Sequence, residues 1–459
     1  GLVYYPLQLY WILIVLGRYG QLSPWITVPA LGLLALYMSL YLVGFSVLTS
    51  RLEGRPCLIW LAPIFWVGLD WLRSWLFTGF PWIDLGYTQY RYPLLIQVAD
   101  LAGHHAVTFL IVMVNCILAL GVRNFPEKLL RPSRPGPALV SALLLLVLAT
   151  GYNLVRHSRV ESEIKGAETL KVAVVQGNIP QDEKWQSGGK ENALEKYLRL
   201  TRLELGKNSP KLVVWPETAM PFYLRDSAAL VILENLATRS GADILTGAPY
   251  RQHDGAGKTV KYYNSAFLID HEGLVAGRYD KEHLVPFGEY VPLKKLLFFL
   301  GPLVESVADF SPGLDPRPIP CQKTRVGVLI CFESIFPDLA RRETRAGAEL
   351  LVNLTNDAWY GRSSAPWQHL SMAVFRSVEN RRSLARAANT GVSGFIDPLG
   401  GLHRLSPLFE DYSDTMSLPL LKSETFFNAG RGYLAGPLCL ALTVLVGMAL
   451  KFRKSTIPC

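Results

Sequence analysis

Six long apolar segments constrain this chain more than any other feature. Most of them approach or exceed the roughly 20 helical residues that cross the hydrocarbon core of a membrane. Buried helices of a large soluble core are the alternative, but uncharged runs of this length are uncommon outside membranes. The sequence therefore predicts membrane-spanning helices, five in the first third of the chain and one near the C-terminus. They cover about residues 1–17, 24–49, 56–78, 94–122, 137–155 and 432–450.

The positive charges predict how these segments are oriented. The chain has 46 Lys and Arg against 37 Asp and Glu, a net charge of +9. No basic stripe interleaved with aromatic residues is present, so we expect no nucleic-acid partner. The positive-inside rule instead places basic loops in the cytoplasm, which leaves residues 156–431 on the extracytoplasmic side. The basic loop residues are Arg51, Arg55, Arg123, Lys128, Arg131, Arg134, Lys451, Arg453 and Lys454.

The third apolar segment is unusual because it contains Asp70 and Arg73 among several tryptophans. Ionisable residues at membrane depth are costly, so they pair with each other or line a polar cavity. Both interpretations remain open from the sequence.

Residues 166–421 have a different pattern. Short β-branched runs typical of buried strands alternate there with stretches of helical periodicity. This alternation predicts an α/β domain in which helices cover a sheet. The expected strands are 170–175, 212–215, 244–247, 265–269, 275–279, 326–330 and 350–354, and the expected helices are 192–205, 228–238, 336–346 and 369–380. The predicted chain is thus a multi-pass helical membrane domain (1–155 and 432–450) joined to an extracytoplasmic α/β domain.

One cysteine lies where a nucleophile is expected. Cys331 follows the apolar strand-like run 325–330 and precedes a predicted helix start. The positive end of a helix dipole favours thiolate, which is the nucleophilic form of cysteine. A small buried hydrophobe is the more common role of a lone cysteine, so its position alone does not decide between the two.

Two further peptides complete a set of groups for acyl chemistry. Glu217 ends the strand-like peptide 213–217 and is able to act as a general base on a thiol. Lys281 is able to stabilise developing negative charge. Singly, Glu217 could cap a turn and Lys281 could be a solvated charge, but together with Cys331 they predict covalent acyl chemistry. The cysteines have no CxxC spacing and no phosphate-binding loop occurs, so we expect no metal and no organic cofactor.

These peptides resemble the nitrilase, or carbon–nitrogen hydrolase, superfamily. The resemblance rests on Trp215-Pro216-Glu217, on Asp280-Lys281 with the later Pro286-Phe287-Gly288-Glu289, and on Cys331-Phe332-Glu333. Residues 77–82, 176–180 and 353–361 further resemble its apolipoprotein N-acyltransferase branch. The resemblance implies an α-β-β-α sandwich for residues 166–421. The branch usually has eight membrane helices, so we expect the sequence to lack part of the N-terminal region.

The resemblance also implies roles for individual residues. Glu217 is expected to be the general base, Lys281 the cation that stabilises the oxyanion, and Cys331 the nucleophile. Glu289 is expected to orient the lysine or the substrate amine, and Glu333 to fix the geometry around the thiolate.

The substrate-binding residues expected from the sequence are aromatic. Trp185, soon after the first strand, is expected to contribute to the acyl site. Phe298 and Phe299 belong to the apolar stretch 292–304, which suits an interfacial arm over that site. Phe332 stands where the family often has tyrosine, so the supporting position beside the nucleophile lacks a hydroxyl group.

The implied reaction is a transfer between lipids. An acyl chain moves from a membrane phospholipid, expected to be phosphatidylethanolamine, through a thioester on Cys331. The acceptor is the α-amine of the N-terminal diacylglyceryl-cysteine of an apolipoprotein, on the periplasmic side of the bacterial inner membrane. A membrane-tethered nitrilase or amidase that hydrolyses a C–N bond is the alternative. The several membrane segments favour the transferase, because a hydrolase needs no more than one anchor.

Overall fold

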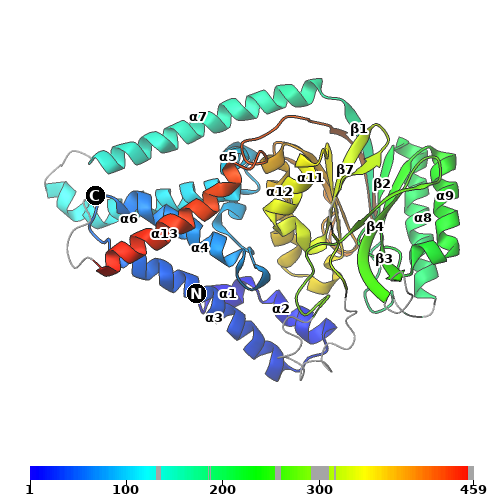
Figure 1. The fold of residues 1–459 in the computed structure, drawn as a ribbon, viewed down its shortest axis with the longest axis horizontal. Helices are drawn as coiled ribbons and strands as arrows, with labels where there is room; N and C mark the ends of the chain where they lie inside the picture. The colour runs from blue at the N-terminus through cyan, green and yellow to red at the C-terminus, as the bar shows by residue number, and fades with distance from the viewer. Residues whose placement is uncertain are drawn as a thin grey trace.

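The computed structural model describes residues 1–130, 136–184, 186, 188–253, 260–290, 310–314 and 317–452, without the side chains of residues 123–130 and 452. Long helices form one half of the molecule, and two β-sheets with their covering helices form the other half (Figure 1).

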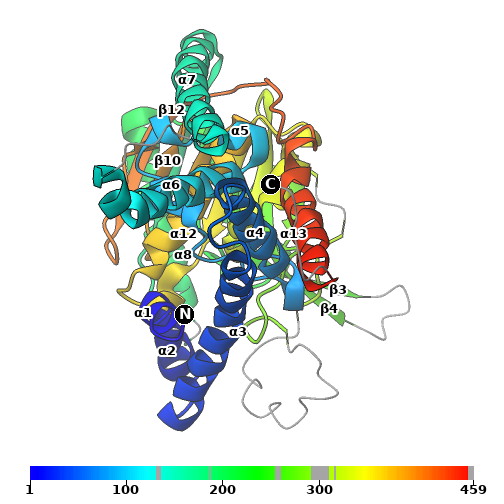
Figure 2. The same cartoon turned by 90° about the vertical axis from the view of Figure 1, so that its left-hand side faces the viewer.

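Five helices dominate the helical half. They are α3 (Pro24–Ser50), α4 (Leu58–Arg73), α6 (His104–Leu130), α7 (Pro137–Gly166) and α13 (Ala435–Phe452). Helix α4 contacts α3, α6 and α13, and Figure 2 shows it among them, with α7 at the opposite edge from α3. Within the described residues, four helical stretches are long and apolar enough to cross a membrane: Pro24–Ser50, His104–Val122, Pro137–Gly166 and Gly432–Lys451.

The other two predicted apolar segments form shorter helices. Residues 1–17 contribute α1 (Tyr4–Gln8), α2 (Trp11–Leu13) and the start of a π-helical turn at Ile14–Tyr19. Residues 56–78 contribute the 16-residue α4 and a 3-10 turn, η2 (Leu76–Thr78). Three more short helices, η3 (Leu85–Gln89), η4 (Pro93–Leu95) and α5 (Ala99–Ala102), connect this region to α6.

The second half contains two six-stranded sheets in the described residues. The first has the order β12-β1-β2-β3-β4-β5, and the second has the order β11-β10-β9-β8-β7-β6. In each sheet the three central strands are parallel and the outer pairings are antiparallel. The strands are β1 (Thr169–Gln176), β2 (Leu212–Val214), β3 (Asp243–His253), β4 (Val260–Ile269), β5 (Val275–Asp280), β6 (Ile319–Cys321), β7 (Thr324–Ile330), β8 (Leu350–Thr355), β9 (Ser383–Ala388), β10 (Gly394–Ile396), β11 (Leu402–His403) and β12 (Tyr412–Pro419).

Helices cover the outer face of each sheet. Helices α8 (Gly189–Asn208) and α9 (Ala228–Ser240) pack on the first sheet, while α11 (Pro337–Arg345) and α12 (Ala365–Asn380) lie between the second sheet and the long helices (Figure 1). The layer between the sheets is filled by apolar side chains such as Val174, Val328 and Val352, all at most 1% exposed. Burial of each such side chain contributes about 1.5–3 kcal/mol. The predicted α-β-β-α sandwich is confirmed.

Candidate active site

Three strand ends supply the predicted acyl-transfer residues. Glu217 follows β2, Lys281 follows β5 and Cys331 follows β7. The first two belong to one sheet and the third to the other, so the site lies where the two sheets meet. Lys281 Nζ lies 3.7 Å from Glu217 Oε1, and the charges of both residues act on the Cys331 thiol. All three side chains are buried, and the structure brings together the residues that the sequence singled out.

Cys331 has an unusual backbone conformation. Its φ is +51°, in the left-handed region that non-glycine residues rarely adopt. Two contacts hold this turn: Glu333 Oε2 accepts a hydrogen bond from Ile330 N–H at 2.7 Å, and His369 Nε2 lies 3.0 Å from the Cys331 carbonyl oxygen. The residue that presents the thiol is therefore fixed from both sides, and backbone strain of this kind is common at functional sites.

The thiol is protonated in the resting site. Burial and, after it, the negative charge of Glu217 raise the pKa of Cys331, and Lys281 lowers it only in part. The helix that starts at this position is the five-residue 3-10 turn η7 (Cys331–Ile335), so its dipole is small. The prediction that a helix dipole favours thiolate here is wrong for the resting state, because burial outweighs the dipole. A protonated thiol needs a base that removes its proton before it can act as a nucleophile.

Glu217 is held by two hydrogen bonds. Its Oε1 accepts from Asn264 Nδ2 at 2.8 Å, and its Oε2 accepts from the Asn356 backbone N–H at 2.9 Å. Asn264 Nδ2 also donates to Glu289 Oε1 at 2.8 Å, so this amide bridges two carboxylates. Sequence reasoning missed Asn264, whose only local signal is a polar residue within an otherwise apolar part of β4.

Lys281 is an ammonium group with two carboxylate partners. Its Nζ lies 3.0 Å from Glu289 Oε1 and 2.9 Å from Oε2, in addition to the Glu217 contact. Burial lowers the pKa of Lys281, but Glu289 and Glu217 outweigh this effect and raise it overall. Glu289 is itself fixed, because its Oε2 accepts from Val285 N–H at 2.8 Å. Lys281 thus stays charged, as required to stabilise an oxyanion.

Glu333 connects the two sheets behind the nucleophile. Its Oε1 accepts from Tyr279 Oη at 2.9 Å, from Glu282 N–H at 2.7 Å and from His283 N–H at 3.1 Å, while its Oε2 accepts from Ile330 N–H. Burial raises its pKa to about 7, although the backbone donors oppose this shift. Glu333 therefore joins the end of β5 to the end of β7, and it acts on the geometry around Cys331 through the backbone.

A second buried set, which sequence reasoning missed, supports Cys331 from α12. His369 Nε2 lies 2.8 Å from Ser334 Oγ, and its Nδ1 lies 3.2 Å from Asp357 Oδ1. Arg386 donates to Asp357 Oδ2 at 2.8 Å. Burial raises the pKa of Asp357, but Arg386 outweighs it and lowers the pKa to about 2. These ion-paired side chains hold His369 in place, and His369 in turn contacts the turn that carries Cys331.

Aromatic residues from the helical half reach the nucleophile turn. Trp82, fully buried, stacks on Phe332 with a centroid distance of 6.4 Å and an interplanar angle of 20°. Its Nε1 donates to Gln368 Oε1 of α12 at 2.8 Å. The side chain of Phe332 therefore packs against the segment that follows α4, which links the predicted site to the membrane half.

The remaining predicted substrate-binding residues, Trp185, Phe298 and Phe299, lie outside the described residues, as does the whole of the proposed arm at 292–304.

Comparison with known proteins agrees with this geometry. Residues 171–411 match the carbon–nitrogen hydrolase family, and residues 1–117 match the apolipoprotein N-acyltransferase N-terminal domain. The apolipoprotein N-acyltransferase of Geobacter metallireducens is 43% identical over 460 residues, which cover 100% of this chain and 86% of the relative. That of Azotobacter vinelandii is 36% identical over 99% of this chain and 86% of the relative. The chain belongs to the apolipoprotein N-acyltransferase family. It is therefore an acyltransferase, and its long apolar helices make it a membrane protein.

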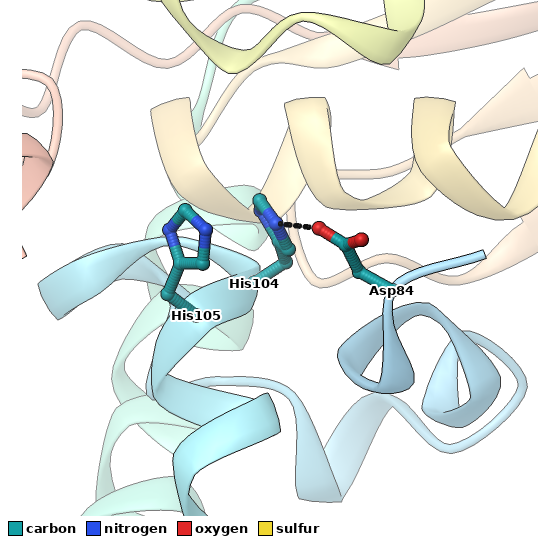
Figure 3. Close-up of side chains that lie close together, drawn as sticks. All are labelled: Asp84, His104 and His105. Atoms are coloured by element: carbon teal, nitrogen blue, oxygen red, sulfur yellow. Dashed lines mark hydrogen bonds and ion pairs between the residues drawn. The ribbon is translucent and has the colours of Figure 1, made fainter. Parts of the chain in front are cut away.

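A further cluster of ionisable side chains in this acyltransferase lies in the helical half. Figure 3 shows Asp84 and His104 pointing toward each other, 2.9 Å apart, with His105 beside them. The ligand atoms of these three residues lie within 4.8 Å of one another, close enough to hold a metal ion. Arg73, however, contacts the other Asp84 oxygen and also pairs with Asp70 at 3.1 Å. A guanidinium group at this position repels a cation, so the donor set fits a network of ion pairs better than a metal site.

Proposed function

We propose that the chain transfers an acyl chain from a membrane phospholipid, with phosphatidylethanolamine as the expected donor, to the N-terminal diacylglyceryl-cysteine of apolipoproteins. The observation that carries this proposal is the meeting of Glu217, Lys281 and Cys331 at a buried site that the membrane half helps to build. Thiol, carboxylate and ammonium together supply a nucleophile, a base and an oxyanion partner.

The first half-reaction forms a thioester. Glu217 accepts the Cys331 proton as the sulfur attacks the ester carbonyl carbon, and Lys281 stabilises the oxyanion that develops. When the intermediate collapses, the bond from that carbon to the glycerol oxygen breaks, and Glu217 returns the proton to this oxygen. Lysophospholipid leaves and the acyl group stays on sulfur. Because Glu217 and Lys281 are already oriented by Asn264, Asn356 and Glu289, little reorganisation accompanies the charge transfer.

The second half-reaction moves the acyl group to nitrogen. The neutral α-amine of the apolipoprotein attacks the thioester carbonyl, and Lys281 again faces the oxyanion. Glu217 accepts the amine proton and passes it to the departing Cys331 sulfur, so the enzyme returns to its starting state. A thioester is the suitable intermediate, because it separates the transfer into two easier steps.

The periplasmic orientation is part of the proposal. Arg51 follows α3, and Lys451 lies in the last turn of α13. Figure 1 shows that α13 ends, and α7 begins, at the end of the helical half remote from the sheets. The positive-inside rule puts that end in the cytoplasm of the bacterial inner membrane, with the sheets on the periplasmic side. Protease added from the periplasmic side should then cleave the α/β domain, and protection of that domain would contradict the orientation.

Intact-mass measurement tests the thioester. Purified protein is incubated with phosphatidylethanolamine, and a mass increase of one acyl group is expected that hydroxylamine removes and that Cys331→Ala lacks. Cys321→Ala is the matched control, since Cys321 is a buried free thiol outside the site, and it should keep the adduct. An active enzyme without an adduct would contradict the two-step mechanism. Release of free fatty acid without transfer to an amine would favour the hydrolase alternative.

A further inference from the structure

Lys184 is a buried lysine that has no role in the mechanism above. In the described part of the chain, two lysines are buried, Lys184 and Lys281, each 1% exposed. Lys281 contacts two carboxylates, whereas Lys184 Nζ has no hydrogen-bond partner among the described residues. A buried charge without a hydrogen-bonded counter-ion costs several kcal/mol, so binding of an anion would stabilise this lysine.

Hydrogen bonds connect the backbone turn that contains Lys184 to Glu217. Lys184 N–H donates to the Pro180 carbonyl at 3.1 Å, which closes a turn with Gln181 inside it. Gln181 Oε1 accepts from Asn356 Nδ2 at 2.8 Å, and the backbone N–H of the same Asn356 donates to Glu217 Oε2. One asparagine thus connects the lysine's turn to the general base.

The charge of Glu217 acts on the Lys184 ammonium group. Burial lowers the pKa of Lys184 to about 8, and the Glu217 carboxylate is the charge that opposes this shift. Below pH 8 the side chain is therefore mainly a cation. Glu217 makes no ion pair with Lys184, and its two carboxylate oxygens already accept hydrogen bonds from Asn264 and Asn356. Lys184 therefore keeps its capacity to bind an anion.

The donor lipid supplies one anion at a suitable distance from the ester. In a glycerophospholipid, five covalent bonds separate the sn-1 ester oxygen from the phosphorus, a span of at most about 6 Å with bonds of ordinary length. Glu217 must reach that ester oxygen in order to protonate it, so the phosphate lies within the same small neighbourhood. We propose that Lys184 binds the phosphate of the phospholipid donor and of the lysophospholipid that leaves. This inference rests on the proposed function.

The inference has a consequence for the order of the two substrates. The α-amine of the apolipoprotein is a cation when protonated, and an ammonium group at Lys184 disfavours its approach. While phosphate is bound, it offsets the repulsion between the Lys184 ammonium and the protonated amine. Once lysophospholipid has left, Lys184 favours the neutral form of the amine over the protonated form. The same lysine therefore favours the phosphate-bearing donor in the first step and the reactive, uncharged acceptor in the second.

A comparison of two acyl donors tests the proposal. The rate of acyl-adduct formation is measured by intact mass with dipalmitoyl phosphatidylethanolamine and with dipalmitoylglycerol, which has the same ester but no phosphate. Loss of one charge-assisted hydrogen bond predicts a decrease of about 10- to 100-fold with the phospholipid in Lys184→Met. The rate with dipalmitoylglycerol should stay within about twofold, and Lys184→Arg should retain most of the phospholipid rate. Lys207→Met, which removes an exposed lysine of α8, is the matched control.

The possible results separate the two proposals. A wild-type protein that forms no adduct with phosphatidylethanolamine would contradict the proposed function itself. Wild-type acylation together with an equal decrease for both donors in Lys184→Met, or with no decrease, would overturn the role of Lys184. A second measurement needs no variant: lysophosphatidylethanolamine should inhibit wild-type acylation at least about tenfold more strongly than monopalmitoylglycerol. Equal inhibition would also overturn the proposal.

Discussion

Replacement of Glu217 by glutamine should change two properties of Cys331 in opposite directions. The Glu217 charge raises the pKa of the Cys331 thiol, so its removal should lower that pKa and increase the thiolate fraction. The same substitution removes the proposed base, so acyl transfer should become slower. Because loosening of the site would also expose the thiol and slow the enzyme, the assay needs a second buried thiol as a control.

The structure sets the expected magnitudes. Lys281 Nζ lies 3.7 Å from Glu217 Oε1, which corresponds to a Coulomb interaction of about 4 kcal/mol at an effective dielectric constant near 20. Removal of the Glu217 charge leaves the positive charge of Lys281 without this opposing anion at the sulfur. We expect the pKa of Cys331 to fall by at least about one unit, which increases the thiolate about tenfold at any pH below the pKa. Loss of a general base should decrease the acylation rate by about 100-fold or more.

The assay is the pH dependence of alkylation by iodoacetamide, read by peptide mass. Cys321 is an internal control, because it is a free thiol whose pKa is raised by burial and by Asp243, remote from Glu217. Its alkylation should be the same in wild type and in Glu217→Gln, and an increase there would report general loosening. If Cys331 alkylation is unchanged or slower in Glu217→Gln while Cys321 is unaffected, Glu217 does not control the thiol and the reasoning is refuted.

Three further substitutions test the supports of the site. Asn264→Ala removes the amide that bridges two carboxylates and should lower the acylation rate about 10- to 100-fold, whereas Asn235→Ala on the exposed side of α9 should not. Trp82→Ala should cost about 3–5 kcal/mol of stability in a thermal or denaturant melt, because a fully buried ring is lost, whereas Trp25→Ala, 89% exposed, should cost less than about 0.5 kcal/mol. Glu333→Gln turns an NH₂ group toward backbone donors and should lower Tm by at least about 3 °C; an unchanged Tm would contradict the connecting role of Glu333.

The sequence predicted the parts of the fold whose signal is local. All seven expected strands were found, because each is a short run of β-branched or apolar residues. Strands β6, β9, β10, β11 and β12 were missed. Strand β9, for example, is rich in alanine and contains Arg386, which no local pattern identifies as buried. Strand β9 pairs with β8 and β10, and its Arg386 is ion-paired with Asp357, 29 residues away. Contacts between residues far apart in the sequence form only in the assembled core, so a short stretch of sequence does not predict them.

The same distinction applies to the site. Glu217, Lys281 and Cys331 were predicted because a carboxylate, a lysine and a thiol occur together in peptides that resemble those of the nitrilase superfamily. Asn264 was not, because its function consists of contacts with carboxylates 47 and 25 residues away. The state of the thiol was mispredicted for a related reason: burial depends on the whole assembly, whereas the helix-dipole argument used only the neighbouring residues.

Helix α12 connects the nucleophile to the membrane half. Near its start, His369 supports the Cys331 carbonyl, and ten residues later, about 15 Å along the helix, Glu379 accepts from the His104 backbone N–H at 3.0 Å. Arg376, between them, donates to Glu379 and to Tyr87 Oη. Buried ion pairs of this kind add little net stability, because desolvation offsets their attraction. Instead, these ion pairs fix the position of α12, since only one register of the helix satisfies them all. We interpret this network as the arrangement that holds the Cys331 turn at a fixed position relative to the long apolar helices.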